Sequence, residues 1–198
     1  MKLIGLTGGI ASGKTMITDY LAALGAPIVD ADAISRRLTA PGSPVLKEIA
    51  EALGSDCLDE HGHLNRKKLA QLIFDDTANR LKLNQIMHPR ISDATQAELK
   101  ALADAGMPCA IYSAPLLLEG GGNSMADEIW IVALDPQEQI RRLMDRDGID
   151  EEAARKRLAA QSSLAEKLAR ADRVIDNNGS RESAQGQAKA LWEESCGR

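Results

Sequence analysis

Gly8-Gly9-Ile10-Ala11-Ser12-Gly13-Lys14-Thr15 is the stretch of sequence that decides the fold. It matches the pattern Gly-x-x-x-x-Gly-Lys-[Ser/Thr] at every fixed position. A short apolar run at residues 2–6 precedes it, and apolar residues recur at helical spacing after it, at Ile17, Leu21 and Leu24. A buried strand, a glycine-rich turn and an amphipathic helix are therefore expected to follow one another at the start of the chain.

Phosphate binding requires these residue types at this spacing. Gly8 and Gly13 allow backbone turns that a Cβ would block, so successive N–H groups converge on phosphate oxygens. The helix beginning near Lys14 adds its positive amino end, the lysine reaches the β- and γ-phosphates, and the Thr15 hydroxyl ligates Mg²⁺. The alternative is a glycine-rich turn with a solvated lysine. The strand before the motif and the helix after it favour a phosphate-binding loop.

Apolar runs alternate with helical patterns along the rest of the chain. A second strand at 26–29 directly follows the first helix, and this β–α–β order indicates a parallel sheet. Ser163 and Glu166 have the spacing of a capping box before another helix. The order of elements predicts a doubly wound α/β fold. The remaining expected strands are 109–112, 129–134 and 173–176, and the remaining expected helices in the sheet-forming part are 137–147, 151–161 and 182–192.

Residues 41–105 differ from this alternation because they contain helical patterns and turns. The helices are expected to be interrupted at His88-Pro89, since the residue before a proline is disfavoured in the α region. We predict one domain over residues 1–198, with this stretch as a helical insertion that covers a substrate. Two basic helices at about 137–161 are expected to form a lid.

Composition limits the partners. The 198 residues include 24 Lys and Arg and 29 Asp and Glu, which give a net charge of −5, and only two Trp, two Tyr and one Phe. An acidic chain with few aromatic residues is not expected to bind nucleic acid. No apolar run approaches the ~18 residues of a membrane span, and the amino-terminal residues do not resemble a signal peptide. Cys57, Cys109 and Cys196 are far apart in the sequence, which predicts reduced thiols in the cytoplasm.

Carboxylates and arginines supply candidate groups for phosphoryl transfer. A guanine-binding Asn-Lys-x-Asp motif is absent from the sequence and the chain is short, which leaves a small-molecule kinase. Asp30 and Asp32 would share a face if the second strand continued, and Asp32 could then accept a hydroxyl proton; equally, it could cap the next helix. Arg142 and Arg146 lie four residues apart and could clamp phosphates, although ion pairs on a solvated helix explain the same spacing.

Several further blocks follow one another along the chain. They are Leu6-Thr7-Gly8-Gly9-Ile10, Val29-Asp30-Ala31-Asp32 with Arg36, His88-Pro89, Pro115-Leu116-Leu117-Leu118-Glu119, Gln139-Ile140-Arg141-Arg142-Leu143, Gln161 and Ala171-Asp172-Arg173-Val174-Ile175-Asp176-Asn177-Asn178-Gly179. In this order they closely resemble the dephospho-coenzyme A kinase family over nearly the whole chain. The resemblance implies a P-loop kinase fold and transfer of the γ-phosphoryl group of ATP, with Mg²⁺, to the ribose 3′-hydroxyl of dephospho-coenzyme A.

The resemblance also implies roles for individual residues. Asp32 would be the general base, Lys14 would act on the phosphates and Arg142 would belong to the lid. The insertion would bind the acceptor, and Asn177 would lie near the adenine of ATP. The residues expected to contact ATP are Gly8, Ala11, Ser12, Gly13, Lys14, Thr15, Met16, Arg142 and Asn177, with Thr15 also binding the metal.

Two departures from the family pattern and two alternative functions accompany this hypothesis. Ala11 stands at a variable position where the family usually has glycine, and the phosphate loop should keep its shape if φ at this residue is negative. The glycines at 120–122 are unusual for the family and affect the path of the loop that follows Glu119. The alternatives are a nucleoside monophosphate kinase and a nucleotide-binding regulatory module. We expect a monomer or weak homo-oligomer, and no zinc site at His61 and His63.

Overall fold

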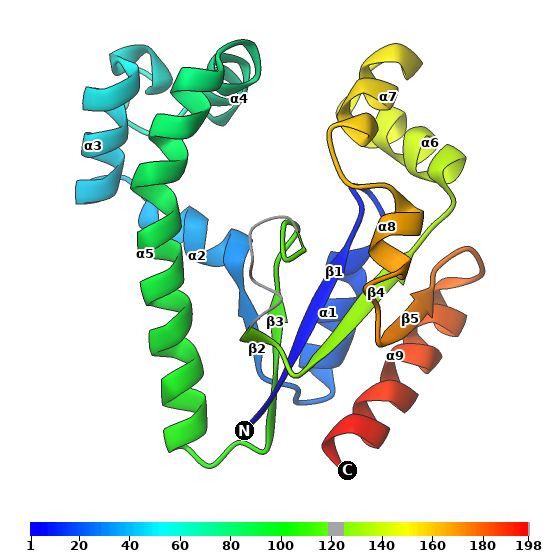
Figure 1. Cartoon of the computed structure of the whole chain (residues 1–198). Coiled ribbons are helices and arrows are strands. Elements are labelled where there is room, and N and C mark those ends of the chain that lie inside the picture. Colours follow the sequence, from blue (N-terminus) through cyan, green and yellow to red (C-terminus); the bar gives the residue numbers. More distant parts are fainter. Residues whose placement is uncertain (119–124, 198) are drawn as a thin grey trace. The chain divides into compact units, whose positions relative to one another are not determined.

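The computed structural model describes residues 1–118 and 125–197, which divide into two compact units (Figure 1). One unit comprises Met1–Asp30 with Ala101–Arg198, and the other comprises Ala31–Lys100. The first unit contains a parallel sheet and the phosphate loop, and the second is helical. The second unit begins ten residues before the predicted insertion because it includes the helix that follows the second strand.

The sheet of the first unit has five parallel strands in the order β2-β3-β1-β4-β5. Helices lie on both of its faces, so the predicted doubly wound fold is confirmed (Figure 1). The strands are β1 (Lys2–Gly8), β2 (Ile28–Asp30), β3 (Cys109–Ser113), β4 (Glu128–Ala133) and β5 (Arg173–Asp176).

Strand β1 lies at the centre of the sheet, between β3 and β4. Ile4 pairs with Ile111 on one side and Leu6 with Trp130 on the other. The strand order reverses at β1, and the carboxyl end of such a strand is where open parallel sheets bind ligands. Strand β2 does not pair with β1, because β3, which follows the second unit in the chain, lies between them.

The core of the sheet forms where the first and last helices cover one face. Helices α1 (Lys14–Ala23) and α9 (Arg181–Cys196) contact each other and bury their apolar residues against the strands. Trp130 on β4 is fully buried in this cluster. This packing fixes the end of β1 relative to the start of α1, and therefore fixes both ends of the phosphate loop.

Three more helices of the first unit follow β4 and lie near the phosphate loop. They are α6 (Pro136–Asp147), α7 (Glu151–Ala159) and α8 (Leu164–Leu168). Helices α6 and α7 pack on each other around Ile140, Leu143 and Ala154, and Ile10 of the phosphate loop joins this small cluster. Ser163 and Glu166 make the predicted capping box at the start of α8.

Glu128, at the amino end of β4, connects four elements of the sheet layer. Its carboxylate accepts hydrogen bonds from Lys2 Nζ (2.6 Å), Trp130 Nε1 (3.1 Å), Arg173 Nε (3.1 Å) and Ser195 Oγ (3.1 Å). Burial alone would raise the pKa of Glu128, but these donors outweigh burial and hold the pKa at about 2. The carboxylate is therefore a charged structural group.

Cys109 and Cys196 form a disulfide, with Cα atoms 5.8 Å apart. The prediction that both are reduced thiols is wrong for this structure. Cys109 begins β3 and Cys196 ends α9, so the fold joins two positions separated by 87 residues. Cys57 is free and buried, and burial raises the pKa of its thiol.

The second unit consists of helices packed around a separate apolar cluster, which includes Ile49, Cys57, Ile86 and Met87. Its elements are α2 (Ala31–Leu38), α3 (Pro44–Leu53), the 3₁₀ turn η1 (Ser55–Cys57), α4 (Arg66–Asp75) and most of α5 (Thr77–Asp104). Ser43 caps α3, since its side chain accepts a hydrogen bond from Val45 N at 3.2 Å.

The predicted interruption at His88-Pro89 is wrong, because α5 continues through Pro89. Proline lacks an N–H group and cannot bond to the preceding turn. Arg90 Nη1 donates to the carbonyl of Ile86 at 2.6 Å, and Arg90 Nη2 donates to Glu48 at 2.5 Å. These bonds and the packing of Ile86 and Met87 stabilise the helix on both sides of the proline.

No helix among the described residues combines the length and the apolar character that crossing a bilayer requires.

Candidate active site

The phosphate loop connects the carboxyl end of β1 to the amino end of α1, as predicted. Gly13 has φ +94° and occupies the N-cap position of α1 without a side-chain cap. The first N–H groups of the helix are therefore available to an anion, which the positive end of the helix dipole also attracts.

Two glycines of the loop are required by close contacts. A Cβ at Gly8 would lie 2.4 Å from Ser12 Oγ and 2.9 Å from the carbonyl oxygen of Val132. A Cβ at Gly13 would lie 2.3 Å from Asn177 Nδ2, at a backbone conformation that already favours glycine. These are the fixed glycines of the motif, so the structure explains their positions.

Ala11 has φ +58°, so the condition that φ be negative at this residue is not met. It is the one described non-glycine residue with a positive φ. A left-handed conformation costs a residue with a Cβ about 1–2 kcal/mol, and the surrounding contacts must supply that energy. One of these contacts is the turn bond from Ser12 N to the carbonyl of Gly9 at 3.0 Å.

Lys14 is held at the carboxyl ends of the neighbouring strands. Its Nζ donates to Ser113 Oγ at 2.7 Å, and Ser113 Oγ donates to Asp30 Oδ2 at 3.3 Å. Ser113 ends β3 and is fully buried. Ser113 is not among the residues predicted from the sequence, because its place beside Lys14 depends on the insertion of β3 between β1 and β2.

Asn177 connects the end of β5 to the phosphate loop. Its Nδ2 donates to the carbonyl of Ser12 at 2.7 Å, and its side chain is buried. The Ser12 hydroxyl is also buried and has no hydrogen-bond partner among the described residues. A buried hydroxyl without a partner is costly, so Ser12 Oγ is suited to bind a ligand oxygen in this cradle.

Thr15 and Met16 follow Lys14 in the first turn of α1. Thr15 is exposed, whereas the Met16 side chain is partly buried against the core of the sheet. Only the main chain of Met16 could then contribute to anion binding, through the amino end of the helix.

Arg142 lies on α6 and is paired with an acidic residue of the same helix. Its Nε donates to Glu138 Oε1 at 2.9 Å, and Arg141 donates two hydrogen bonds of 2.7 Å to the same carboxylate. Arg141, and to a smaller extent Arg142, hold the pKa of Glu138 at about 2. An open cavity of about 640 Å³ lies here, with Arg142, Glu138, Asn178 and Gly179 among its lining residues.

The other arginines of α6 form ion pairs on the surface. Arg141 Nη1 contacts Asp145 at 2.9 Å, and Arg146 Nε contacts Asp147 at 2.7 Å. For Arg146, the ion-paired surface alternative matches the structure better than the phosphate clamp.

Asp32 lies in the first turn of α2, in the second unit. Strand β2 ends at Asp30, so the hypothesis that both carboxylates share the face of a continuing strand is wrong. Asp32 is half-buried and follows the carboxyl end of β2 by two residues.

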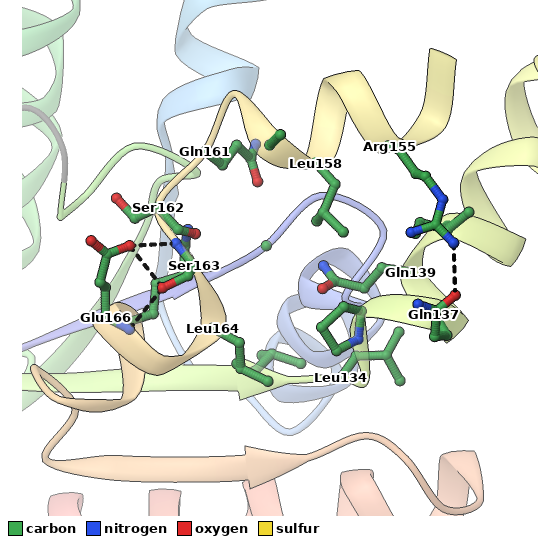
Figure 2. A pocket seen from close by; sticks show the side chains of 16 residues that line it. Leu134, Gln137, Gln139, Arg155, Leu158, Gln161, Ser162, Ser163, Leu164 and Glu166 are labelled. Carbon is green, nitrogen blue, oxygen red and sulfur yellow. Dashed lines mark hydrogen bonds between the residues drawn. The ribbon is translucent and has the colours of Figure 1, made fainter. Parts of the chain in front are cut away.

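A cavity of about 510 Å³ lies between β4, α6, α7 and α8 (Figure 2). Its wall includes Gly9 of the phosphate loop, Gln139 of α6, and Leu158 and Gln161 at the end of α7. Figure 2 shows Gln139 and Gln161 on either side of the loop.

No group of three or more His, Cys, Asp or Glu residues suited to a metal occurs within residues 1–118 and 125–197. The rings of His61 and His63 lie 6.1 Å apart and both side chains are exposed. Glu119 and the glycines at 120–122, which the sequence analysis also considered, lie outside the described residues.

The chain is similar to known proteins over nearly its whole length. A family model described as dephospho-CoA kinase matches residues 2–183. A dephospho-CoA kinase of Syntrophotalea carbinolica is 47% identical over 191 residues, covering 96% of this chain and 90% of the relative. One from Geobacter sulfurreducens is 42% identical over 192 residues, covering 97% of this chain and 98% of the relative.

Solved structures share the fold. The protein TT1252 from Thermus thermophilus superimposes with a TM-score of 0.83 at 31% identity, covering 98% of this chain and 97% of that one. Dephospho-CoA kinase from Campylobacter jejuni gives 0.72 at 24% identity, over 100% and 98% of the two chains. Shikimate kinase from Bacteroides thetaiotaomicron gives 0.54 at 14% identity, with 98% of each chain covered.

The extent of these matches does not favour a nucleoside monophosphate kinase or a regulatory module. With its intact phosphate loop, the chain belongs to the dephospho-CoA kinase family and carries out the ATP-dependent phosphorylation of dephospho-CoA in coenzyme A biosynthesis.

Proposed function

We propose that the phosphate loop holds the β- and γ-phosphates of ATP, with Lys14 as the cationic group that follows the transferred phosphoryl. The observation that carries this proposal is the placement of the Lys14 ammonium, 2.7 Å from Ser113 Oγ, beside the uncapped amino end of α1. Gly8, Ala11, Ser12, Gly13, Thr15 and Met16 complete the set of nucleotide-binding residues, the last through its main chain. Ser113 keeps Lys14 directed at the cradle.

Mg²⁺ fits the residues near the loop. The Thr15 hydroxyl is exposed in the first turn of α1 and can supply one hard oxygen ligand. No group of three acidic or imidazole ligands accompanies it among the described residues, and Mg²⁺ commonly takes its other ligands from water and substrate phosphates. When bound, the metal neutralises charge that develops on the phosphates.

Asp32 is the proposed general base. A carboxylate can accept the proton of the ribose 3′-hydroxyl as its oxygen attacks the γ-phosphorus, and ADP leaves in line. The family motif Val29-Asp30-Ala31-Asp32 supports this role, as does the position of Asp32 just after a strand's carboxyl end. We assign acceptor binding to the helical part of the chain, about residues 41–105.

Arg142 and Asn177 are proposed to contact the nucleotide from the two elements that follow β4 and β5. Arg142 lines an open cavity on α6 and can exchange Glu138 for a phosphate oxygen. Asn177 donates to the loop carbonyl of Ser12, and this contact with the cradle supports the proposed position near the adenine. The segment 137–161 would then act as the lid that excludes water.

The remaining proposals concern location, assembly and partners. We propose a cytoplasmic enzyme, monomeric or weakly homo-oligomeric, that acts on small molecules and not on nucleic acid or membranes. The net charge of −5 supports the exclusion of nucleic acid as a partner.

The test of the catalytic assignment is Asp32→Asn. We expect kcat to fall about 10²- to 10⁴-fold, while the Kd for ATP stays within a few-fold because the base acts on the acceptor. Coenzyme A formation by mass spectrometry and ATP binding by calorimetry measure the two quantities. Asp19→Asn, an exposed change on α1, is the control. Near-normal turnover in Asp32→Asn would exclude it as the base.

A further inference from the structure

Two glutamines hold the main chain of Ile10 in the phosphate loop. Gln161 Oε1 accepts a hydrogen bond from Ile10 N at 2.9 Å, and Gln139 Nε2 donates one to the Ile10 carbonyl at 2.6 Å. Both backbone groups of this residue are therefore bound by side chains from outside the loop, one from α6 and one from the end of α7 (Figure 2).

The contact with Gln139 is close and buried. The Gln139 side chain is buried, and a Cβ at Gly9 would lie 2.5 Å from its Nε2. Gly9 is a variable position of the phosphate-binding pattern, so the motif itself does not require a glycine there. The structure gives a reason for it: the loop must pass close to an amide that donates to the next residue.

The bond to the Ile10 carbonyl also bears on the conformation of Ala11. That carbonyl belongs to the peptide that contains the Ala11 nitrogen, and Ala11 has φ +58°. A residue with a Cβ disfavours this region, so the loop needs outside contacts to stay in it. Gln139 supplies such a contact at the peptide concerned.

The side chains of the same two residues pack in the direction of the glutamines. Ile10 and Ala11 contact the cluster of Ile140, Leu143 and Ala154 between α6 and α7. The loop corner is thus attached to α6 and α7 by apolar packing and by two directed hydrogen bonds.

We propose that Gln139 and Gln161 are positioning residues for phosphoryl transfer, which hold the phosphate loop in its nucleotide-binding conformation through the N–H and carbonyl groups of Ile10. The inference rests on the proposed binding of ATP phosphates by this loop. It assigns opposite chemistry to the two residues: Gln139 must donate, and Gln161 must accept.

Because one glutamine accepts and the other donates, the same Gln→Glu substitution at both positions tests the proposal with equal added charge. Gln161→Glu keeps an oxygen that can accept from Ile10 N, whereas Gln139→Glu loses its donor and places a carboxylate against a carbonyl. Both variants add one negative charge beside the same loop. We expect the Kd for ATP, measured by calorimetry without acceptor, to rise at least tenfold in Gln139→Glu and less than threefold in Gln161→Glu.

Neutral variants separate the hydrogen bond from charge and folding. Gln139→Leu and Gln161→Leu each remove one bond at similar volume, and each should raise the Kd for ATP about tenfold with a small change in the KM for dephospho-CoA. Gln185→Glu on α9, also half-buried, controls for added charge. Thermal unfolding identifies any variant that fails to fold. If one variant fails, the other substitution at the same position tests the positioning role.

The outcomes are distinct. Equal losses in Gln139→Glu and Gln161→Glu, or normal ATP affinity in both leucine variants, would overturn the positioning role. Lys14→Ala measured in parallel tests the underlying assignment. If it also leaves ATP affinity unchanged, the proposed nucleotide site itself is wrong; if it weakens ATP while the glutamine variants do not, only the positioning role fails.

Discussion

The two ends of the parallel sheet differ in how their polar groups are paired. At the carboxyl ends of the strands, polar groups remain available: within residues 1–118 and 125–197, no side chain caps the amino end of α1 and none bonds to the buried Ser12 hydroxyl. At the amino ends, Glu128 receives four donors, and the Cys109–Cys196 disulfide joins β3 to α9. The polar groups at the carboxyl ends can bind a ligand, whereas those at the amino ends are already paired within the protein.

This difference indicates which end of the sheet lowers the stability of the fold and which end raises it. The carboxyl end contains a left-handed Ala11 and an unbonded buried hydroxyl, and both reduce stability. The amino end contains a charge network and a covalent link, and both add stability. Substitutions at the carboxyl end should therefore change function more than stability, and substitutions at the amino end should do the reverse.

A pair of lysines at the two ends of β1 and its loop tests this division. Lys14→Ala should reduce kcat/KM for ATP about 100-fold or more, because it removes a charge from the transferring phosphates. Lys2→Ala should lower the free energy of unfolding by about 1 kcal/mol through loss of a donor to Glu128, with kcat/KM within twofold. Steady-state kinetics and urea unfolding measure both. A loss of activity in Lys2→Ala without unfolding would contradict the division.

The disulfide should be the larger stabilising contribution at the amino end. It closes a long loop, since the two cysteines are 87 residues apart, and such a link commonly contributes about 2–5 kcal/mol. The double variant Cys109→Ser with Cys196→Ser should unfold at lower urea, with kcat/KM within twofold. Dithiothreitol should lower the Tm of the wild type and leave that of the double variant unchanged. A wild-type Tm that is insensitive to the reductant would show that the pair is not oxidised in solution.

Acid should lower the free energy of unfolding by protonating Glu128 at the amino end of the sheet. Its pKa of about 2 lies below the usual 4.5, so the folded state favours the charged form. The resulting stability, on the order of 3 kcal/mol, is complete above pH 4.5 and is lost as the pH falls from 4.5 towards 2. Unfolding free energies of the wild type and Glu128→Gln should therefore converge in this window. Glu60→Gln, which is exposed, should instead parallel the wild type throughout. If the unfolding free energy of Glu128→Gln instead stayed parallel to that of the wild type across this pH range, Glu128 would not be the source of the acid sensitivity.

The local parts of the fold could be predicted from the sequence. The strand, phosphate loop and helix at residues 2–24 are encoded by neighbouring residues, and the capping box at Ser163 depends on two positions. The roles of Asp32 and Arg142 needed the family resemblance as well, because spacing alone left them open, and both stay proposals.

Contacts between distant segments could not be predicted. Ser113 reaches Lys14 only because β3 inserts between β1 and β2, and Cys109 meets Cys196 only when α9 packs against the sheet. Pro89 lies inside a helix because tertiary packing and the bonds of Arg90 outweigh a local preference. The left-handed Ala11 depends on partners from α6 and α7, which its own sequence neighbourhood does not contain.

Substitution of Glu138 should give the smallest effect. It refines the comparison of the two ends of the sheet, because Glu138 is an ion-paired group at the ligand-binding end. It holds Arg142, so an ATP phosphate must compete with a carboxylate whose pKa is about 2. Glu138→Gln keeps the side-chain shape and weakens that competition, and we expect a two- to threefold lower Kd for ATP at low ionic strength. The gain should disappear at high salt, because screening reduces interactions between exposed charges. Asp145→Asn, which removes a partner of Arg141 only, should leave the Kd unchanged. A higher Kd in Glu138→Gln would mean that Glu138 orients Arg142 towards the nucleotide.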